Sequence, residues 1–221
     1  MSMGLGEISS GIVVLFMFIL GVLLTKHYLA NRRIYMFWWA IAFWLAFLAA
    51  ITDFISYLAH GWSPFQYRLY LFSAASLVAY MGAGTVFLFS ERVGRIYVLL
   101  MTVVAMAMCY SLAIIPVEGI STIPAGEKAQ GFVPNGIGVY FGILSGIGAI
   151  ALFVGALYSW YRSKKSYNLW IAMGALVFSI GGVVGKYIGV YQLFYVFQAV
   201  GSVILYYGII SSISKRSTLR S

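Results

Sequence analysis

Three charged residues stand within or beside long apolar stretches, and their side chains are the best suited to chemistry: Asp53, Arg68 and Lys186. An unpaired charge in a bilayer is costly, so we expect Asp53 to pair with Arg68 or the three to line a polar pocket. Two cations against one carboxylate would suit an anionic or carbonyl-bearing ligand. The alternative is a buried salt bridge that fixes helix register, with Lys186 reaching the surface. Gln198 and Tyr80 are further candidates, either as ligand contacts or as hydrogen bonds between helices.

Other catalytic arrangements are not evident in the sequence. His27 and His60 lie at the ends of apolar stretches, where they are badly placed to ligate a haem inside a helix bundle, and no His, Cys, Asp or Glu cluster has metal-ligand spacing. The serines of the apolar stretches lack a nearby base, and the single cysteine, Cys109, rules out a disulfide framework. We therefore expect no enzyme, no metal and no cofactor.

The composition places most of the chain in a membrane. Of 221 residues, 62% are hydrophobic and only 9% are charged, whereas soluble domains carry about 25% charged residues. A membrane span needs about 20 mostly apolar residues. Seven stretches meet this condition, at 8–29, 34–58, 66–90, 95–115, 137–160, 168–188 and 191–213. The sequence predicts an all-α fold in which residues 1–221 form one domain of seven transmembrane helices.

The basic residues orient these spans. Of the 14 Lys and Arg residues, the outer side keeps Arg68, Lys128 and Lys186. The others fall in connections and ends that share the opposite side: Lys26, Arg32, Arg33, Arg92, Arg95, Arg162, Lys164, Lys165, Lys215, Arg216 and Arg220. Cytoplasmic loops are rich in Lys and Arg, so we expect an external N-terminus, a cytoplasmic C-terminus and a multi-pass protein of a prokaryotic cell membrane. The net charge of +9 then reflects topology and contact with anionic membrane lipids, not nucleic acid.

Small residues predict which faces pack together. In the second span, Asp53 shares one side with a stripe of alanines, Ala42, Ala46, Ala49 and Ala50. Glycines form GxxxGxxxG in the fifth span (Gly138, Gly142, Gly146) and in the sixth (Gly181, Gly185, Gly189). This motif permits close helix contact, so we expect spans five and six to pack through it, with homo-oligomer formation as the alternative. Aromatic residues near the outer ends, Trp62 and Tyr67 among them, are typical of interfacial belts.

Two segments resemble a known group of sequences: "GWSPFQYRLYLFSAASLVAYMGAGTVFLF" and "GALYSWYR" are similar to stretches of predicted prokaryotic membrane proteins without an established activity. The resemblance implies seven spans and a family-typical place for Asp53 and Arg68. The topology also invites comparison with microbial rhodopsins, but the last span contains no lysine to carry retinal. Basic, aromatic starts of spans two and six ("RRIYMFWW", "KKSYNLWI") suggest a three-plus-one-plus-three repeat by analogy with SWEET transporters, whose helix prolines are missing here.

These observations favour a small transporter or ligand-binding protein with an outward-facing polar pocket near Asp53, Arg68 and Lys186. The leading alternative is a non-catalytic structural or accessory subunit of a larger membrane complex, since polar groups are scarce below the outer third of the spans. A sensor ranks third, because the cytoplasmic loops are very short.

Overall fold

A computed structural model describes residues 5–116, 136–164, 166–187 and 191–217, and within these ranges the chain is helical, with no strands. The helices are α1 (Leu5–Asn31), α2 (Ile34–Leu58), α3 (Pro64–Phe87), α4 (Glu91–Ile114), α5 (Ile137–Ser163), α6 (Ser166–Tyr187) and α7 (Tyr191–Ser217). The all-α class and the order of seven helices are confirmed. The longest connection, residues 117–135, lies outside the described ranges.

Capping residues explain why two helices begin earlier than the hydropathy predicted. Pro64 occupies the first turn of α3, and the Ser63 hydroxyl accepts a hydrogen bond from the backbone N–H of Gln66 at 3.3 Å. The Ser90 hydroxyl likewise accepts from the N–H of Val93 at 3.4 Å. These side chains satisfy donors that a helix N-terminus leaves open, so α3 starts at Pro64 and α4 at Glu91 instead of at residues 66 and 95.

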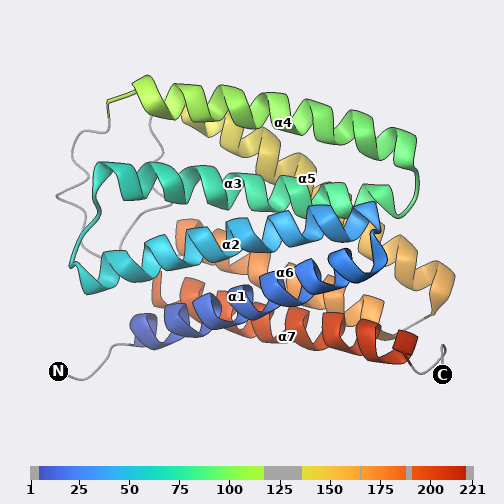
Figure 1. Ribbon diagram of the computed structural model, residues 1–221. Coiled ribbons are helices and arrows are strands. Elements are labelled where there is room, and N and C mark those ends of the chain that lie inside the picture. The colour runs from blue at the N-terminus through green and yellow to red at the C-terminus, as the bar shows by residue number, and fades with distance from the viewer. Residues whose placement is uncertain (1–4, 117–135, 165, 188–190, 218–221) are drawn as a thin grey trace.

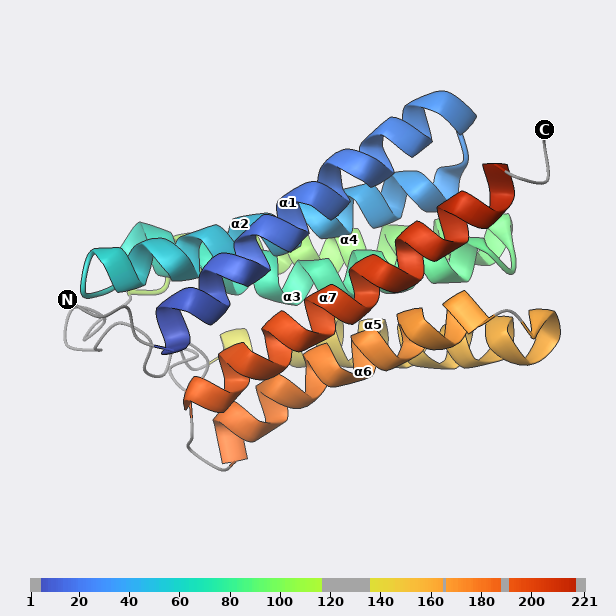
Figure 2. The same ribbon diagram turned by 90° about the horizontal axis from the view of Figure 1, so that it is seen from below.

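Six of the helices form a closed ring. Its order is α1, α2, α3, α5, α6, α7 and back to α1, and α4 packs outside the ring against α3 and α5. Figure 1 shows α4 above α3, with α1 and α7 on the opposite side, and Figure 2 shows α1, α7 and α6 side by side from below. The ring brings the two chain-terminal helices together and gives α3 three neighbours, α2, α4 and α5.

Five helical segments are long and apolar enough to cross a membrane. They are Ile8–Asn31, Ile34–Leu58, Pro64–Phe87, Glu91–Ile114 and Ile137–Tyr161. In α6 and α7 the described apolar segments are shorter, Leu169–Phe178 and Val196–Ser211. These lengths and compositions are those of a multi-pass membrane protein.

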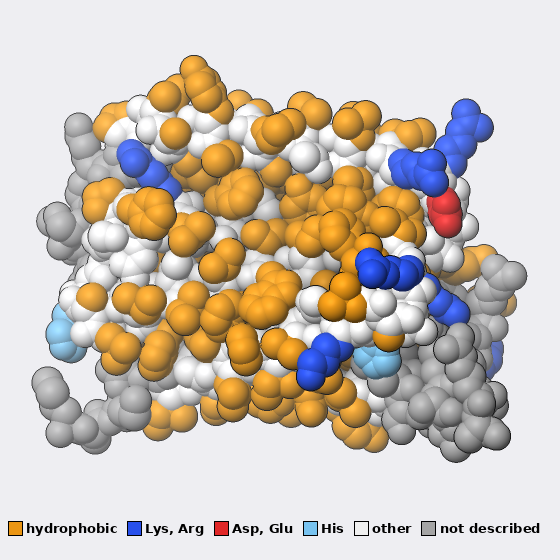
Figure 3. All heavy atoms as spheres, viewed as in Figure 1, with side chains coloured by type: hydrophobic (Ala, Val, Ile, Leu, Met, Phe, Trp, Pro, Cys, Tyr) orange, Lys and Arg blue, Asp and Glu red, His pale blue; other side chains and the backbone are white. Residues whose placement is uncertain are grey.

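Cations and apolar side chains are separated on the surface. Figure 3 shows Lys and Arg gathered mainly at one end of the molecule, with hydrophobic side chains over its middle. The exposed cations of the connections and helix ends at that end are Lys26, Arg32, Arg33, Arg92, Arg95 and Lys164. The predicted grouping of these residues on one side of the spans is confirmed.

The outermost helix, α4, buries only a narrow stripe. Its buried residues recur at helical spacing and face α3 and α5: Gly94, Met101, Ala105, Met108 and Leu112. Large apolar side chains cover the rest of its surface, among them Leu99, Val103 and Met106, which are 65%, 51% and 60% exposed. An exposed apolar surface of this extent is the pattern of a helix surrounded by lipid.

Close helix contacts form at glycines other than those predicted. A Cβ at Gly148 of α5 would lie 2.5 Å from the carbonyl carbon of Val78 in α3, and one at Gly201 of α7 would lie 2.6 Å from the backbone nitrogen of Phe178 in α6. Only a glycine lets the two backbones approach so closely. The α3–α5 and α6–α7 contacts therefore carry the tight packing that the sequence placed between spans five and six.

The fifth-span glycine motif makes no close contact with the described residues. Gly138, Gly142 and Gly146 are exposed, and a Cβ at any of them would meet no described atom within 4 Å. The sixth-span motif cannot be compared in the same way, since the surroundings of Gly181, Gly185 and Gly189 fall outside the described residues.

Candidate functional site

Asp53 is buried in the half of the ring that lies away from the basic end. Its residue exposure is only 5%, and it continues the stripe of Ala42, Ala46 and Ala49, all buried. On the opposite side of α2, Leu48, Ile55 and Leu58 are exposed. The predicted two faces of α2 are thus confirmed. Asp53 lies five residues before the last residue of α2, which is about 7.5 Å along the helix axis.

Arg68 contacts the end of α4, whereas the sequence predicted a contact with Asp53 of α2. Its Nη2 donates a hydrogen bond to the carbonyl oxygen of Ile115, the residue after α4, at 3.1 Å. A cation at this position satisfies a carbonyl left open at the helix end and opposes the negative end of the helix dipole. An ion pair joins Glu91 and Arg95, 3.3 Å apart on the surface of α4. The sequence predicted Asp53 as the partner of Arg68, and did not predict this contact with the end of α4.

Tyr80 joins two helices in the middle of the bundle. Its hydroxyl lies 3.1 Å from the Thr102 hydroxyl of α4, and its ring stacks on Trp38 of α2 with centroids 5.4 Å apart and planes 13° from parallel. Of the two roles considered for this residue, the structure shows the hydrogen bond between helices.

The Tyr80–Thr102 contact gives a measurable coupling. We expect Tyr80→Phe and Thr102→Val, made singly and together in purified protein, to show a coupling free energy of about 0.6 kcal/mol in unfolding, the average for such bonds in membranes. The aromatic stack on Trp38 is preserved in Tyr80→Phe, so the cycle isolates the hydroxyl. Strictly additive single effects would show that the hydroxyl pair contributes nothing.

The remaining predicted site residues lie on α6 and α7. Gln198 of α7 is half-buried, and its backbone carbonyl accepts a hydrogen bond from the Ser202 hydroxyl at 2.5 Å. Lys186 lies one residue before the end of α6, and its side chain falls outside the described residues. In the ring, α1 lies between α2 and α7, and α5 lies between α3 and α6. The helices that carry Gln198 and Lys186 are therefore not direct neighbours of those that carry Asp53 and Arg68.

An aromatic cluster at the start of α3 was not predicted from the sequence. Trp62 and Tyr67, which were expected in an interfacial belt, are 4% and 0% exposed, and Tyr70 is 6% exposed. The Trp62 ring contacts both tyrosines, with centroid distances of 5.8 Å to Tyr67 and 5.2 Å to Tyr70. The Ser63–Pro64 helix start was the available signal, because it fixes Trp62 immediately before the first turn of α3.

Two buried hydroxyls on α3 lack the intrahelical hydrogen bond that five other Ser and Thr hydroxyls make. Thr52, Ser56, Thr85, Ser145 and Ser202 each donate to a carbonyl of their own helix. Ser73 and Ser76 are 0% exposed, yet their hydroxyls have no hydrogen-bond partner among the described residues. Burial of a hydroxyl without a partner is costly, so these two serines are unusual positions in α3.

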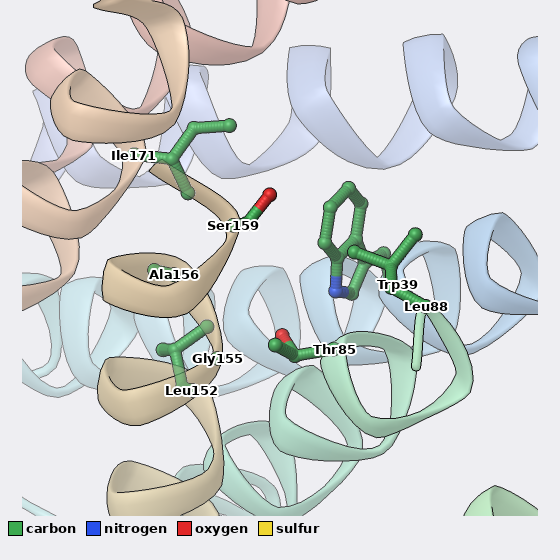
Figure 4. A pocket seen from close by; sticks show the side chains of 8 residues that line it. All are labelled: Trp39, Thr85, Leu88, Leu152, Gly155, Ala156, Ser159 and Ile171. Carbon is green, nitrogen blue, oxygen red and sulfur yellow. The ribbon is translucent and has the colours of Figure 1, made fainter. Parts of the chain in front are cut away.

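A small hollow lies at the opposite, basic end of the bundle, between α2, α3, α5 and α6 (Figure 4). Its lining residues are Trp39, Thr85, Leu88, Leu152, Gly155, Ala156, Ser159 and Ile171. Trp39 Nε1 and Thr85 Oγ1 both donate to the carbonyl oxygen of Met81, at 3.2 and 3.1 Å. Since both donors already bind a backbone carbonyl, the wall of the hollow is mostly apolar. The hydrogen bond from Trp39 to Met81 also links α2 to α3.

Few polar side chains come together in the described part of the chain. Within the described ranges, no three His, Cys, Asp or Glu side chains come together as ligands for a metal ion. Away from the basic end, the rings of Trp62, Tyr67 and Tyr70 come together, and Asp53 is buried near the end of α2.

Comparison of the chain with protein families, with curated proteins and with solved structures finds no match.

Proposed function

We propose that the chain is a seven-span protein of a prokaryotic cytoplasmic membrane that binds or transports a small polar ligand through a site around Asp53. Its basic end would face the cytoplasm, with the N-terminus outside. The five long apolar segments and the single basic end support the topology. For α6 and α7, total helix lengths of 22 and 27 residues support the two further crossings.

The observation that carries the functional proposal is the burial of Asp53. Ionisable residues inside membrane bundles are costly and mark ligand or ion sites far more often than apolar positions do. Asp53 is 5% exposed, and it continues the stripe of buried alanines on the face of α2 that is turned into the ring. A carboxylate kept at this depth in an apolar bundle supports a ligand site.

Ligand stabilisation tests this proposal. We expect at least one member of a panel of small anions, cations, amines and sugars to raise the thermal midpoint of the purified protein, since a ligand at 100 times its Kd stabilises by about 2.7 kcal/mol. The shift should be lost in Asp53→Asn and kept in Glu91→Gln, whose carboxylate lies on the exposed surface of α4. A panel that leaves the midpoint unchanged would count against a ligand site.

An accessory subunit is the second candidate. The specific observation in its favour is the apolar interior below the outer third, where Met17, Leu20, Phe43, Leu71 and Leu77 are buried and offer no path for a polar solute. We expect such a subunit to co-purify with a stable partner from native membranes. Recovery of a lone monomer under mild solubilisation would exclude this candidate.

A further inference from the structure

Close contacts at glycines divide the seven helices into two units. At such a contact, a Cβ on the glycine would lie 3.3 Å or less from an atom of the neighbouring helix. In the first unit these contacts join α1 to α2, α2 to α3, and α3 to both α4 and α5, at Gly21, Gly84, Gly82 and Gly148. In the second unit, Gly174, Gly201 and Gly208 join α6 to α7 in the same way. No described glycine makes such a contact between α5 and α6 or between α1 and α7. The helices α1–α5 and the α6–α7 hairpin therefore form two tightly packed units that meet along two looser seams.

The α5–α6 seam is closed at the basic end and open at the other end. At the basic end, Leu152 and Ala156 of α5 are buried and line the small hollow together with Ile171 of α6. Ala156 lies eighteen residues after Gly138, which is about five helical turns, so the two residues share a face of α5. Gly138 is nevertheless exposed, and a Cβ there would meet no described atom within 4 Å. Figures 1 and 2 agree with this difference, because α5 and α6 lie together near their connection and diverge toward their other ends.

A single connection joins the α6–α7 hairpin to the α1–α5 unit. It follows Ser163 at the basic end, and Lys164 adopts a left-handed conformation there, with φ 50° and ψ 19°. The second seam, between α1 and α7, includes the ring contact of Phe16 with Tyr206, whose centroids are 5.3 Å apart. Packed side chains of this kind can slide past one another, whereas backbones in direct contact cannot separate without losing their packing. A rotation about the connection would therefore move the far end of the hairpin most.

The exposed glycines of α5 offer the surface that such a rotation would cover. Gly138, Gly142 and Gly146 lie in the half of α5 away from the basic end, and open space adjoins each of them. The sequence of α6 carries glycines at the same spacing, Gly181 and Gly185 among them. Small residues at this spacing let two helices in lipid approach closely and gain packing energy. The motif is thus suited to a contact that the open seam does not make.

We propose that the α6–α7 hairpin rotates as one body about the connection at Lys164 and so opens and closes the α5–α6 seam at the end away from the basic end. The structure has the open arrangement, and in the closed one α6 would pack on Gly138, Gly142 and Gly146. Asp53 is buried in the same half of the ring, so the movement would control access to it. That consequence rests on the proposed function, whereas the movement itself needs no ligand.

Distances between paired spin labels on the full-length protein in lipid nanodiscs test the movement. Labels at Val139 and Leu193 join the two units at the open end, labels at Leu157 and Met173 join them at the basic end, and labels at Ile114 and Val139 stay within the first unit. All five side chains are exposed. Val139 lies about 36 Å from the end of α5, so a rotation of about 10° would shift the first distance by about 6 Å. We expect two distances for the first pair and one for each of the others.

Two substitutions assign the shorter distance to the glycine face. The labelled proteins carry Cys109→Ser, because the native thiol is exposed on α4. Gly142→Leu would fill the surface that α6 must approach, so the shorter distance of the Val139–Leu193 pair should be lost. Val154→Leu adds bulk at another exposed position of α5 and should keep both distances. Both positions are open in this structure, so neither substitution should prevent folding.

The outcomes separate this inference from the proposed function. A single distance for the Val139–Leu193 pair, as narrow as that of the Ile114–Val139 pair, would overturn the movement and leave the ligand site standing. A dipolar signal from protein labelled at Val139 alone, with the shorter distance, would overturn it as well, since the glycines would then join two copies of the chain. Two distances that Gly142→Leu leaves unchanged would also contradict it. Two distances that Gly142→Leu reduces to one, without a response to any compound of the panel, would support the movement and count against the ligand site.

Discussion

Val103→Arg is expected to prevent stable insertion of α4, whereas Val93→Arg on the same helix is expected to be tolerated. Both valines are exposed, at 51% and 55%. Val103 lies twelve residues after Glu91, about 18 Å along the axis, near the centre of a hydrocarbon core about 30 Å thick. An arginine there costs about 2.5–3.5 kcal/mol, while Val93 lies in the first turn beside Arg92 and Arg95, where cations already gather.

The measurement is the fraction of chains in which α4 inserts, scored with a reporter for membrane insertion, together with the yield of extractable full-length protein. In water, an exposed valine replaced by arginine changes stability by no more than about 0.5 kcal/mol. Equal insertion and yield for the two variants would therefore show that α4 does not face lipid. The matched pair removes any general effect of adding one positive charge.

Gly148→Ala is expected to destabilise the bundle, although Ala is the better helix former. A Cβ at Gly148 would lie 2.5 Å from the carbonyl carbon and oxygen of Val78 and 2.7 Å from the backbone nitrogen of Ala79. Backbone atoms cannot rotate aside as side chains do, so α3 and α5 must separate. We expect the free energy of unfolding to fall by about 1–3 kcal/mol, the usual effect of overpacking.

Gly142→Ala is the control on the same helix. Gly142 is exposed and its Cβ would meet no described atom within 4 Å, so the substitution should leave stability unchanged or raise it by up to about 1 kcal/mol. Unfolding of the purified proteins in one detergent, followed by heat or denaturant, measures the difference. Equal stability of the two variants would contradict the α3–α5 contact, and the reverse order would support the packing predicted from the GxxxG motif.

The sequence predicted the helices well because hydropathy and charge act along the chain. Seven helices in the expected order, the buried alanine stripe of α2 and the basic end all follow from which residues tolerate lipid, and each is present in the structure. The number of helices that cross a membrane stays a prediction, and five of them are long and apolar enough to do so. The predicted starts of α3 and α4 were less accurate, because Ser63 and Ser90 cap these helices by hydrogen bonds that hydropathy does not detect.

Contacts between helices were harder to predict, because they depend on which faces meet. Gly148 and Gly201 are isolated in the sequence yet make the close contacts, whereas the regular motif of Gly142 is exposed. The same limit applies to the site. Arg68 has a side chain long enough to reach either Asp53 or the end of α4, and only the placement of α4 against α3 decides between them. Trp62 was predicted to lie in an interfacial belt, because its position in the sequence indicates its depth along the bundle but not whether its side chain points inward or outward.

The position of the two chain ends tests the central claim, that lipid is the solvent and that seven helices cross it. In Figure 1, α1 begins and α7 ends at opposite ends of the bundle. Short tags added at each end of the full-length chain, probed with a membrane-impermeant protease on intact cells and after lysis, give the compartment directly. We predict an N-terminal tag that is cleaved on intact cells and a C-terminal tag that is cleaved only after lysis. Cleavage of both tags, or of neither, on intact cells would contradict an odd number of crossings and, with it, an Asp53 site that opens to the outside.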